Sequence, residues 1–320
     1  MHTAPLASAA TATATVATTT ARPPLAVVRD VLLLAKPRLS GLVVCTAAGG
    51  LWLAPGRREA VPAAVLLAGT TLVVGAANAL NNFLERDVDA RMRRTRNRPL
   101  PSGRVEPWVA VAIGLGVPSL ALPALASFTN GLTAALGALA LFLYVVVYTP
   151  MKRTSSLALF VGAVPGAIPP LMGWTAATGR LDAGGLALFA LLFLWQLPHF
   201  LSVSLYLKDD YARGGLKVFA IVHGEQATRA WIAVLTVALV PVSLSLVPLG
   251  LAGPAYGAIS VALGGGLVGY ALFGLVERAP AHGSPDRRSH RAGPRWARSF
   301  FLLTLAYLTL LFAALLLGAR

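Results

Sequence analysis

Nine apolar segments, each about 17 to 25 residues long, alternate along the chain with short polar stretches. An α-helix of that length crosses a bilayer, because each residue adds about 1.5 Å and the hydrocarbon core is about 30 Å thick. Several segments contain proline or glycine, which membrane helices tolerate where neighbours satisfy the freed backbone groups. The pattern therefore predicts an all-α polytopic membrane protein with nine transmembrane helices. These are expected near residues 39–55, 61–84, 107–127, 131–150, 156–177, 183–206, 229–250, 254–276 and 299–318.

Composition agrees with a membrane protein, since 56% of the 320 residues are hydrophobic, 12% are charged and the mean hydropathy is +0.70. The net charge of +15 would suggest a nucleic-acid partner if the basic residues formed one patch on a soluble domain. They lie instead in short loops between apolar segments. We therefore expect contact with the lipid bilayer and no nucleic-acid partner.

The basic residues also predict the orientation of the chain. With nine spans the termini lie on opposite sides, and all but four of the 27 Lys and Arg fall on the side of the N-terminus. The positive-inside rule then places the N-terminus in the cytoplasm. The excess of Arg over Lys favours a bacterial plasma (inner) membrane, with a mitochondrial membrane as the open alternative. The four exceptions are Arg57, Arg58, Arg180 and Arg320.

Outside the spans, residues 1–28 form an Ala- and Thr-rich stretch that we expect to be a disordered N-terminal tail, although an organellar transit peptide stays open. Residues 29–320 then form a single transmembrane domain. The one cysteine, Cys45, allows neither an intrachain disulfide nor a thiolate metal cluster. Nucleophile-elbow, phosphate-loop and zinc-spacing motifs are also absent from the sequence.

An acidic and basic cluster at residues 81–103 carries most of the functional information. Asn81, Glu85 and Asp89 fall at i, i+4 and i+8, so on a continuous helix they share one face. Carboxylate and amide oxygens suit Mg²⁺, which proteins commonly share with substrate phosphates. We interpret the three as metal ligands and catalytic residues, with Asn82 beside them as a substrate contact. The alternative is a polar helix end that only marks the membrane boundary.

Basic and polar residues in two loops are candidates for binding phosphate. One group precedes the turn sequence PLPSG, and the other belongs to YTPMKR at the end of the fourth span. The alternative for the arginines of the first group is that they only set the orientation of the chain in the membrane. The candidates are Arg94, Asn97, Arg98, Tyr148, Lys152 and Arg153.

The sixth span offers a second group. Gln196 and His199 lie within apolar sequence, where the histidine is either an acid/base or substrate contact or an inert core residue. Asp209 and Asp210 follow the span, as the first acidic cluster follows the second span. This weak repeat predicts two four-helix units around a central cavity, plus a ninth helix. Both clusters would then hold one Mg²⁺-bridged diphosphate, with Asp209 and Asp210 as metal ligands.

The motif NNFLERDVDARMRRTRNRPLPSG resembles the first acidic motif of the UbiA-type intramembrane prenyltransferases. Further motifs resemble the branch of that family that farnesylates haem: KPRLSG, YTPMKR, GAVPGAIPPLMGW, WQLPHF and KDDYARGG. The similarity runs from about residue 30 to 230. Two departures from the wider family are that Asn82 and Glu85 stand where many members have Asp, and that Leu207 and Tyr211 occupy the ends of the second motif.

The resemblance implies transfer of the farnesyl group of farnesyl diphosphate to a vinyl group of haem B, with water addition, giving haem O. It implies a cytoplasmic site, a Mg²⁺ cofactor, and Lys152, Arg153 and residues 94–98 as diphosphate contacts. The roles of Gln196, His199, Asp209, Asp210 and Tyr211 would be in substrate binding or catalysis. A haem A synthase or terminal oxidase assembly would receive the product. Alternatives are another prenyl acceptor, such as a quinone precursor or chlorophyllide, and a transporter.

Overall fold

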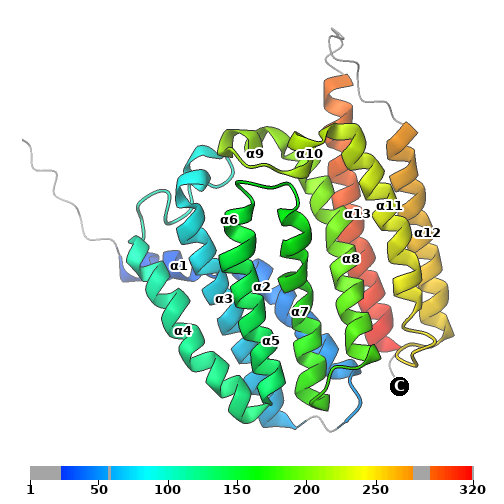
Figure 1. The fold of residues 1–320 in the computed structure, drawn as a ribbon, viewed down its shortest axis with the longest axis horizontal. Helices are drawn as coiled ribbons and strands as arrows, with labels where there is room; N and C mark the ends of the chain where they lie inside the picture. Colours follow the sequence, from blue (N-terminus) through cyan, green and yellow to red (C-terminus); the bar gives the residue numbers. More distant parts are fainter. Residues whose placement is uncertain (1–22, 57–58, 277–288, 319–320) are drawn as a thin grey trace, which may run out of the picture.

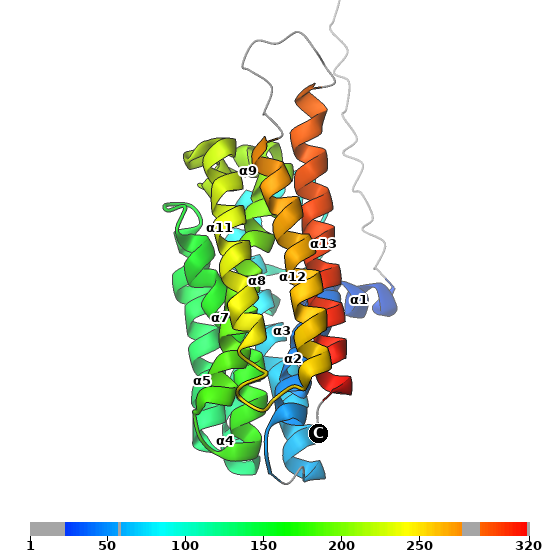
Figure 2. The ribbon, with the colours of Figure 1, turned by 90° about the vertical axis from the view of Figure 1, so that its right-hand side faces the viewer.

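The computed structural model describes residues 23–56, 59–276 and 289–318, and in these ranges all regular structure is helical (Figure 1). The long helices run roughly side by side as one bundle (Figure 2). The fourth span consists of α5, a π-helical stretch η1 (Leu143–Tyr148) and α6 (Thr149–Met151). The long helices are α2 (Pro37–Leu53), α3 (Ala60–Arg91), α4 (Pro107–Phe128), α5 (Gly131–Phe142), α7 (Ala158–Thr178), α8 (Ala183–Tyr206), α11 (Gly224–Leu244), α12 (Pro254–Val276) and α13 (Ser289–Leu317).

The nine-span, all-α prediction is confirmed. Within the described ranges, eight helical segments are long and apolar enough to cross a bilayer. The ninth candidate is α2, which passes the same test only when counted with α1 (Pro24–Leu34), a helix bent from it by 49° across residues 35 and 36. The protein is therefore an integral, multi-pass membrane protein.

Neighbouring helices follow the same order in two halves of the bundle. In the first half α2 packs on α3, α3 on α4 and α4 on α5, and in the second half α7 packs on α8, α8 on α11 and α11 on α12. The halves meet where α2 packs on α7, and α13 is added against α8 and α12. This order is the one expected for two four-helix units with an appended ninth helix.

Small residues allow the two halves to approach closely. A Cβ atom on Gly50 of α2 would lie 2.0 Å from the carbonyl oxygen of Pro170, and one on Gly173 of α7 would lie 2.0 Å from that of Ala47. The backbones of α2 and α7 are therefore in direct contact, which is how membrane helices gain packing energy without a hydrophobic driving force. An alanine at either glycine would force these helices apart.

Two boundaries differ from the sequence prediction. Helix α1 begins at Pro24, so residues 24–28, expected in the tail, are helical, while residues 1–22 lie outside the described ranges. Proline is favoured in the first turn of a helix, and an apolar run follows it. Helix α11 spans Gly224–Leu244, earlier than the predicted 229–250. The residues added at its start include Glu225, which accepts hydrogen bonds from the guanidinium of buried Arg229 one turn later.

One end of the bundle is covered by two short helices, α9 (Lys208–Gly214) and α10 (Phe219–Val222), which cross over it at the top of Figure 1. Helix α3 extends to Arg91 and reaches the same end, followed by the turn-rich loop that carries Arg94 and Arg98. The loops after the second, fourth and sixth spans therefore meet here. We call this the site end of the bundle.

Candidate functional site

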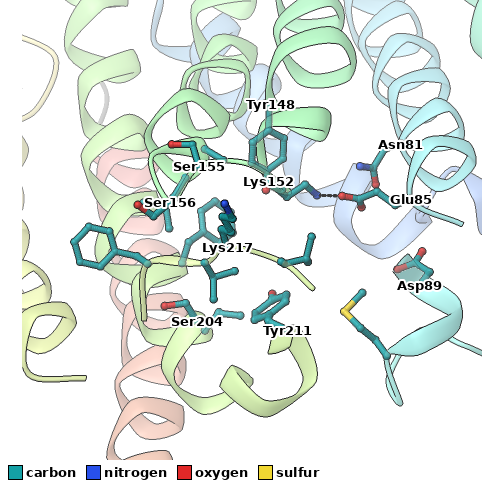
Figure 3. A pocket seen from close by; sticks show the side chains of 18 of the residues that line it. Asn81, Glu85, Asp89, Tyr148, Lys152, Ser155, Ser156, Ser204, Tyr211 and Lys217 are labelled. Carbon is teal, nitrogen blue, oxygen red and sulfur yellow. Dashed lines mark ion pairs between the residues drawn. The ribbon is translucent and has the colours of Figure 1, made fainter. Parts of the chain in front are cut away.

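The face of α3 predicted from the sequence lines a cavity of about 180 Å³ at the site end. Asn81, Glu85 and Asp89 are 1%, 7% and 1% exposed, and Figure 3 shows them in a row along the helix. They share a face because α3 continues as one helix past the end of its apolar run. As the spacing predicts, the three oxygen-bearing side chains therefore line one cavity, and their role as metal ligands stays a prediction.

Each of these three side chains is met by a cation from a different element. The Lys36 Nζ atom, between α1 and α2, donates to Asn81 Oδ1 at 2.8 Å. Lys152, just after α6, forms an ion pair with Glu85, drawn as a dashed line in Figure 3. The Arg98 Nη1 atom, in the loop after α3, donates to Asp89 Oδ2 at 2.7 Å. Three acceptors therefore lie interleaved with three cations.

The donor set fits Mg²⁺ in kind. Asp89 Oδ1 is buried and, among the residues that the structure describes, has no hydrogen-bond partner, which leaves a carboxylate oxygen available to a cation. Glu85 and Asn81 add a carboxylate and an amide oxygen. The described ranges contain no group of three or more His, Cys, Asp and Glu that could hold a metal. Substrate phosphate and water would therefore have to complete the coordination, as is usual for Mg²⁺.

Aromatic rings support the cationic side of the cavity. Lys152 Nζ lies 4.6 Å from the centroid of the Tyr148 ring, a cation–π contact, and Tyr144 lies 5.4 Å from Tyr148 in η1. The Thr149 hydroxyl accepts from Asn81 Nδ2 at 3.1 Å. This bond fixes the Asn81 amide with its oxygen toward Lys36.

The second acidic cluster, Asp209 and Asp210, does not line the cavity, and its role as a metal ligand stays a prediction. Asp210 is buried and accepts from the backbone N–H groups of Arg93 at 2.8 Å and Arg94 at 3.4 Å, and from Arg213 Nη2 at 2.8 Å. It therefore anchors the loop after α3. Burial raises the pKa of Asp210, but these hydrogen bonds outweigh it and hold the pKa below its ordinary value. Asp209 is exposed to solvent.

Of that stretch only Tyr211 lines the cavity, as Figure 3 shows. Asp210 and Tyr211 are adjacent on the short helix α9, so their side chains point in different directions. The side chain of Asp210 faces the loop after α3, whereas that of Tyr211 faces the space between α3 and α8. Burial raises the pKa of the Tyr211 phenol, so it stays a neutral hydroxyl group at physiological pH.

The side chains of α8 that were predicted to contact the substrate, Gln196 and His199, do not line the cavity. His199 is buried against α13, where its Nδ1 atom lies 2.8 Å from Thr304 Oγ1 and its ring lies 4.7 Å from those of Trp195 and Phe301. Gln196 is likewise buried, and its amide donates to backbone carbonyls of α7 and α8. The inert-core alternative is the one that this packing favours. The cavity residues of α8 are Phe200, Val203 and Ser204.

Some of the remaining candidate residues line the cavity, and others form hydrogen bonds that hold neighbouring segments together. Arg94 lines the cavity with Arg98. Arg153 does not, and its Nη2 atom donates to the Leu84 carbonyl at 2.6 Å, which ties α6 to α3. Asn82 donates to the Leu34 carbonyl of α1 at 2.9 Å, and Asn97 offers its own carbonyl to Arg104.

Sequence reasoning missed part of the lining. Lys36 belongs to the KPRLSG motif but was not singled out, although a lysine directly before the proline that opens an apolar run is an unusual placement. Apart from Phe200, the last residue of WQLPHF, the apolar residues of the cavity belong to no motif, because they look like any other lipid-facing or core position. These residues are Ala158, Leu159, Phe200, Val203, Leu216, Val218 and Phe219.

The cavity thus has two sides: acids and cations from α3 and its neighbours line one, and mainly apolar side chains from α7, α8 and α10, with Ser155, Ser156 and Lys217 among them, line the other. Such an arrangement suits a substrate with a strongly anionic group joined to an apolar body. The structure defines a multi-pass membrane protein with a substrate site of this kind at one end of its bundle.

The model of the UbiA prenyltransferase family matches residues 42–285, which is most of the chain. The chain belongs to the UbiA prenyltransferase family and is a transferase. The protoheme IX farnesyltransferase of Anaeromyxobacter sp. (strain Fw109-5) is 66% identical over 292 residues, covering 91% of this chain and 94% of that protein. That of Anaeromyxobacter dehalogenans (strain 2CP-C) is 59% identical over 305 residues, covering 95% and 99%.

Solved structures share the fold at low sequence identity. A structure of digeranylgeranylglyceryl phosphate synthase has a TM-score of 0.75 at 14% identity and covers 92% of this chain and 98% of that one. A UbiA homolog from Archaeoglobus fulgidus, bound to DMAPP and Mg²⁺, has a TM-score of 0.58 at 15% identity and covers 88% and 99%. These similarities establish the arrangement of the helices.

Proposed function

We propose that the protein transfers the farnesyl group of farnesyl diphosphate to a vinyl group of haem B and, with addition of water, forms haem O. The observation that carries the proposal is the row of Asn81, Glu85 and Asp89, each met by a cation, beside an apolar half-cavity. The choice of substrates is supported by the shared name of the two relatives above, which are 66% and 59% identical to this chain.

The polar half binds the diphosphate in this proposal. The basic residues that line the cavity supply positive charge from four parts of the sequence: Lys36, the loop residues Arg94 and Arg98, Lys152 and Lys217. Arginine can grip phosphate with two parallel hydrogen bonds, whereas lysine acts as a point charge. Such fixed charges stabilise a leaving diphosphate because they are already oriented before the charge develops.

Asn81, Glu85 and Asp89 would hold Mg²⁺ together with the diphosphate. The metal would supply Lewis-acid neutralisation of the negative charge that develops on the leaving group. The unpartnered Asp89 Oδ1 atom supports this assignment, as does the UbiA homolog from Archaeoglobus fulgidus, whose structure contains DMAPP and Mg²⁺. Glu85 and Asp89 also form ion pairs with Lys152 and Arg98.

The reaction then follows from the position of these charges. The bond between C1 of the farnesyl group and the diphosphate oxygen breaks, and its electron pair leaves with the diphosphate. The haem vinyl group donates its π electrons to C1, which forms the new carbon–carbon bond. The cation left on the neighbouring carbon takes the oxygen of a water molecule, which loses a proton to solvent. The apolar walls, including Phe200 and Val203, delay access of water until the carbon–carbon bond has formed.

We further propose that the site end faces the cytoplasm of a bacterial plasma membrane. The excess of basic residues in the loops at this end supports this orientation. Haem O would then be released for use by a haem A synthase or in terminal oxidase assembly.

Mass spectrometry of products formed by the full-length protein in lipid nanodiscs tests the proposal. The protein is supplied with Mg²⁺, labelled farnesyl diphosphate and, in separate reactions, haem B, a quinone precursor or chlorophyllide. We expect a labelled product with the mass of haem O from haem B alone. A product from one of the other acceptors, with none from haem B, would overturn the assignment of the acceptor.

A further inference from the structure

Helix α1 exposes a row of large apolar side chains. Leu25, Val28 and Leu32 are 81%, 54% and 61% exposed, and their spacing places them on one face of the helix. Asp30 and Leu34, on the opposite face, are buried. The protein therefore covers the face of α1 that carries Asp30 and leaves open a mainly apolar face, on which Arg29 is also exposed.

The covered face of α1 is fixed in place by the loop between α3 and α4. Asp30 forms an ion pair with Arg104 of that loop at 3.2 Å, and Leu34 packs with Leu100 and Val105 of the same loop. This loop lies at the site end of the bundle. The exposed face of α1, which points the other way, is therefore turned toward the depth of the bilayer.

The position of α1 along the bundle axis also indicates that its exposed face meets the lipid. In Figures 1 and 2 α1 lies across the bundle, whereas α3 runs along it. Asn82 and Asn78 of α3 donate to the carbonyls of Leu34 and Ala35 at the end of α1. The apolar part of α3 below this level, residues 60–80, is about 30 Å long, which is the thickness of the hydrocarbon core. Helix α1 thus lies where the hydrocarbon ends.

We propose that α1 lies in the plane of the membrane interface at the site end, with Leu25, Val28 and Leu32 inserted at the boundary between headgroups and acyl chains. The partner of this surface is the lipid of that leaflet. The apolar row continues into Leu39 and Leu42, which are exposed on α2, so it extends the lipid-facing surface of the bundle. Helices of this kind bind by burying their apolar face about 5 to 10 Å into the interface.

The position of α1 in the membrane also affects Lys36, a residue of the site. Lys36 follows α1 directly, has a left-handed backbone conformation with φ of 49°, and places its Nζ atom on Asn81. A lysine held in that conformation depends on its surroundings, since non-glycine residues rarely adopt it. Helix α1 is therefore a membrane-anchored support for Lys36. This second part rests on the proposed function, whereas the membrane position of α1 does not.

Spin labelling in nanodiscs tests the membrane position without any reaction. Single cysteines at Leu25, Val28 and Leu32 are labelled in a Cys45→Ala background. Leu120, which is 77% exposed on α4, serves as the lipid-facing control, and Asp87, whose side chain is 75% exposed near the end of α3, serves as the water-facing control.

The three α1 labels are expected to be more accessible to oxygen than to a water-soluble nickel complex, as at Leu120 and opposite to Asp87. The proposal is overturned if they behave like Asp87. It is also overturned if they are shielded from both reagents, which would mean that residues 1–22 or a second copy of the chain covers this face.

A binding measurement tests the link to Lys36. The variant carrying Leu25→Ser, Val28→Ser and Leu32→Ser is expected to bind farnesyl diphosphate several-fold more weakly in nanodiscs, while Leu120→Ser binds it as the unaltered protein does. Equal affinity in both variants would refute the support role. If the unaltered protein does not bind farnesyl diphosphate at all, the proposed function fails, and the spin-label result still decides the position of α1.

Discussion

Two acidic clusters end two apolar helices at the same end of this bundle, yet they do different work. The cluster on α3 lines the cavity, and its carboxylates face lysine and arginine side chains that a ligand can recruit. In the second cluster, Asp210 faces backbone N–H groups of a loop, and Asp209 faces solvent. The contacts of the carboxylate oxygens therefore indicate whether an acidic residue near a membrane boundary belongs to a site. Its position in the sequence alone does not.

The largest expected effect comes from neutralising the α3 carboxylates. Glu85→Gln and Asp89→Asn are each expected to lower kcat/KM by about 100-fold or more, because each removes a charge from the group that we propose holds Mg²⁺ and that pairs with the cations of the cavity. The matched control is Asp87→Asn on the same helix, whose side chain is 75% exposed. The assignment of α3 fails if the control loses as much activity as the two cavity variants.

Adjacent basic residues provide a sharper comparison. Lys152→Gln is expected to lower kcat/KM by about 10- to 100-fold, since Lys152 points into the cavity and pairs with Glu85. Arg153→Gln removes a bond to the Leu84 carbonyl outside the cavity and is expected to cost a few-fold at most. Steady-state kinetics on both variants in one lipid composition measures the difference. The reverse order would show that the two side chains exchange roles when substrate binds.

The second cluster is expected to act through structure. Asp210→Asn removes charge-assisted hydrogen bonds to the loop that carries Arg94 and Arg98, which should cost about 1 to 3 kcal/mol of stability and lower activity about tenfold. Asp209→Asn is expected to change neither thermal stability nor rate. Thermal unfolding in nanodiscs measures the first effect. Retained stability in Asp210→Asn would argue that the loop is held by other contacts.

The same aspartate predicts a dependence on pH. Because its pKa is lowered in the folded state, Asp210 contributes stability above its ordinary pKa of about 3.9. That contribution disappears as the pH falls through the lower, folded-state pKa. The backbone amides of residues 93 and 94 should therefore stay protected from hydrogen exchange, relative to their intrinsic rates, down to about pH 4 and lose protection only in stronger acid. Loss of protection at these two amides already at pH 6 would contradict the anchor role.

The smallest effects compare two neighbours on α8. Phe200→Ala opens the apolar half of the cavity and is expected to raise the KM for the haem acceptor several-fold. His199→Leu disturbs the contact with Thr304 and is expected to lower thermal stability while leaving both KM values within about twofold. Kinetics with each substrate varied in turn separates the two. A large change in the acceptor KM for His199→Leu would restore the histidine to the site.

Much of the fold could be predicted from the sequence, because the bilayer imposes its thickness on every span and periodicity places Asn81, Glu85 and Asp89 on one face. Which side chains near the end of α8 face the cavity could not be predicted. Whether His199 or Phe200 faces the cavity depends on how α8 packs against α13, which is a contact between residues about 100 positions apart. Likewise the contacts of Asp210 could not be predicted, because two of its partners are the backbone N–H groups of residues 93 and 94, which leave no trace in the side-chain pattern.

Calorimetric titration of farnesyl diphosphate into the protein in nanodiscs, with and without Mg²⁺, tests the central claim most directly. We compare the unaltered protein, the Glu85→Gln/Asp89→Asn variant and the Asp209→Asn variant. The account predicts Mg²⁺-dependent binding that disappears in the α3 variant and persists in Asp209→Asn. Binding that keeps its full Mg²⁺ dependence in the α3 variant, or loses it in Asp209→Asn, would contradict the assignment of the metal and diphosphate to α3.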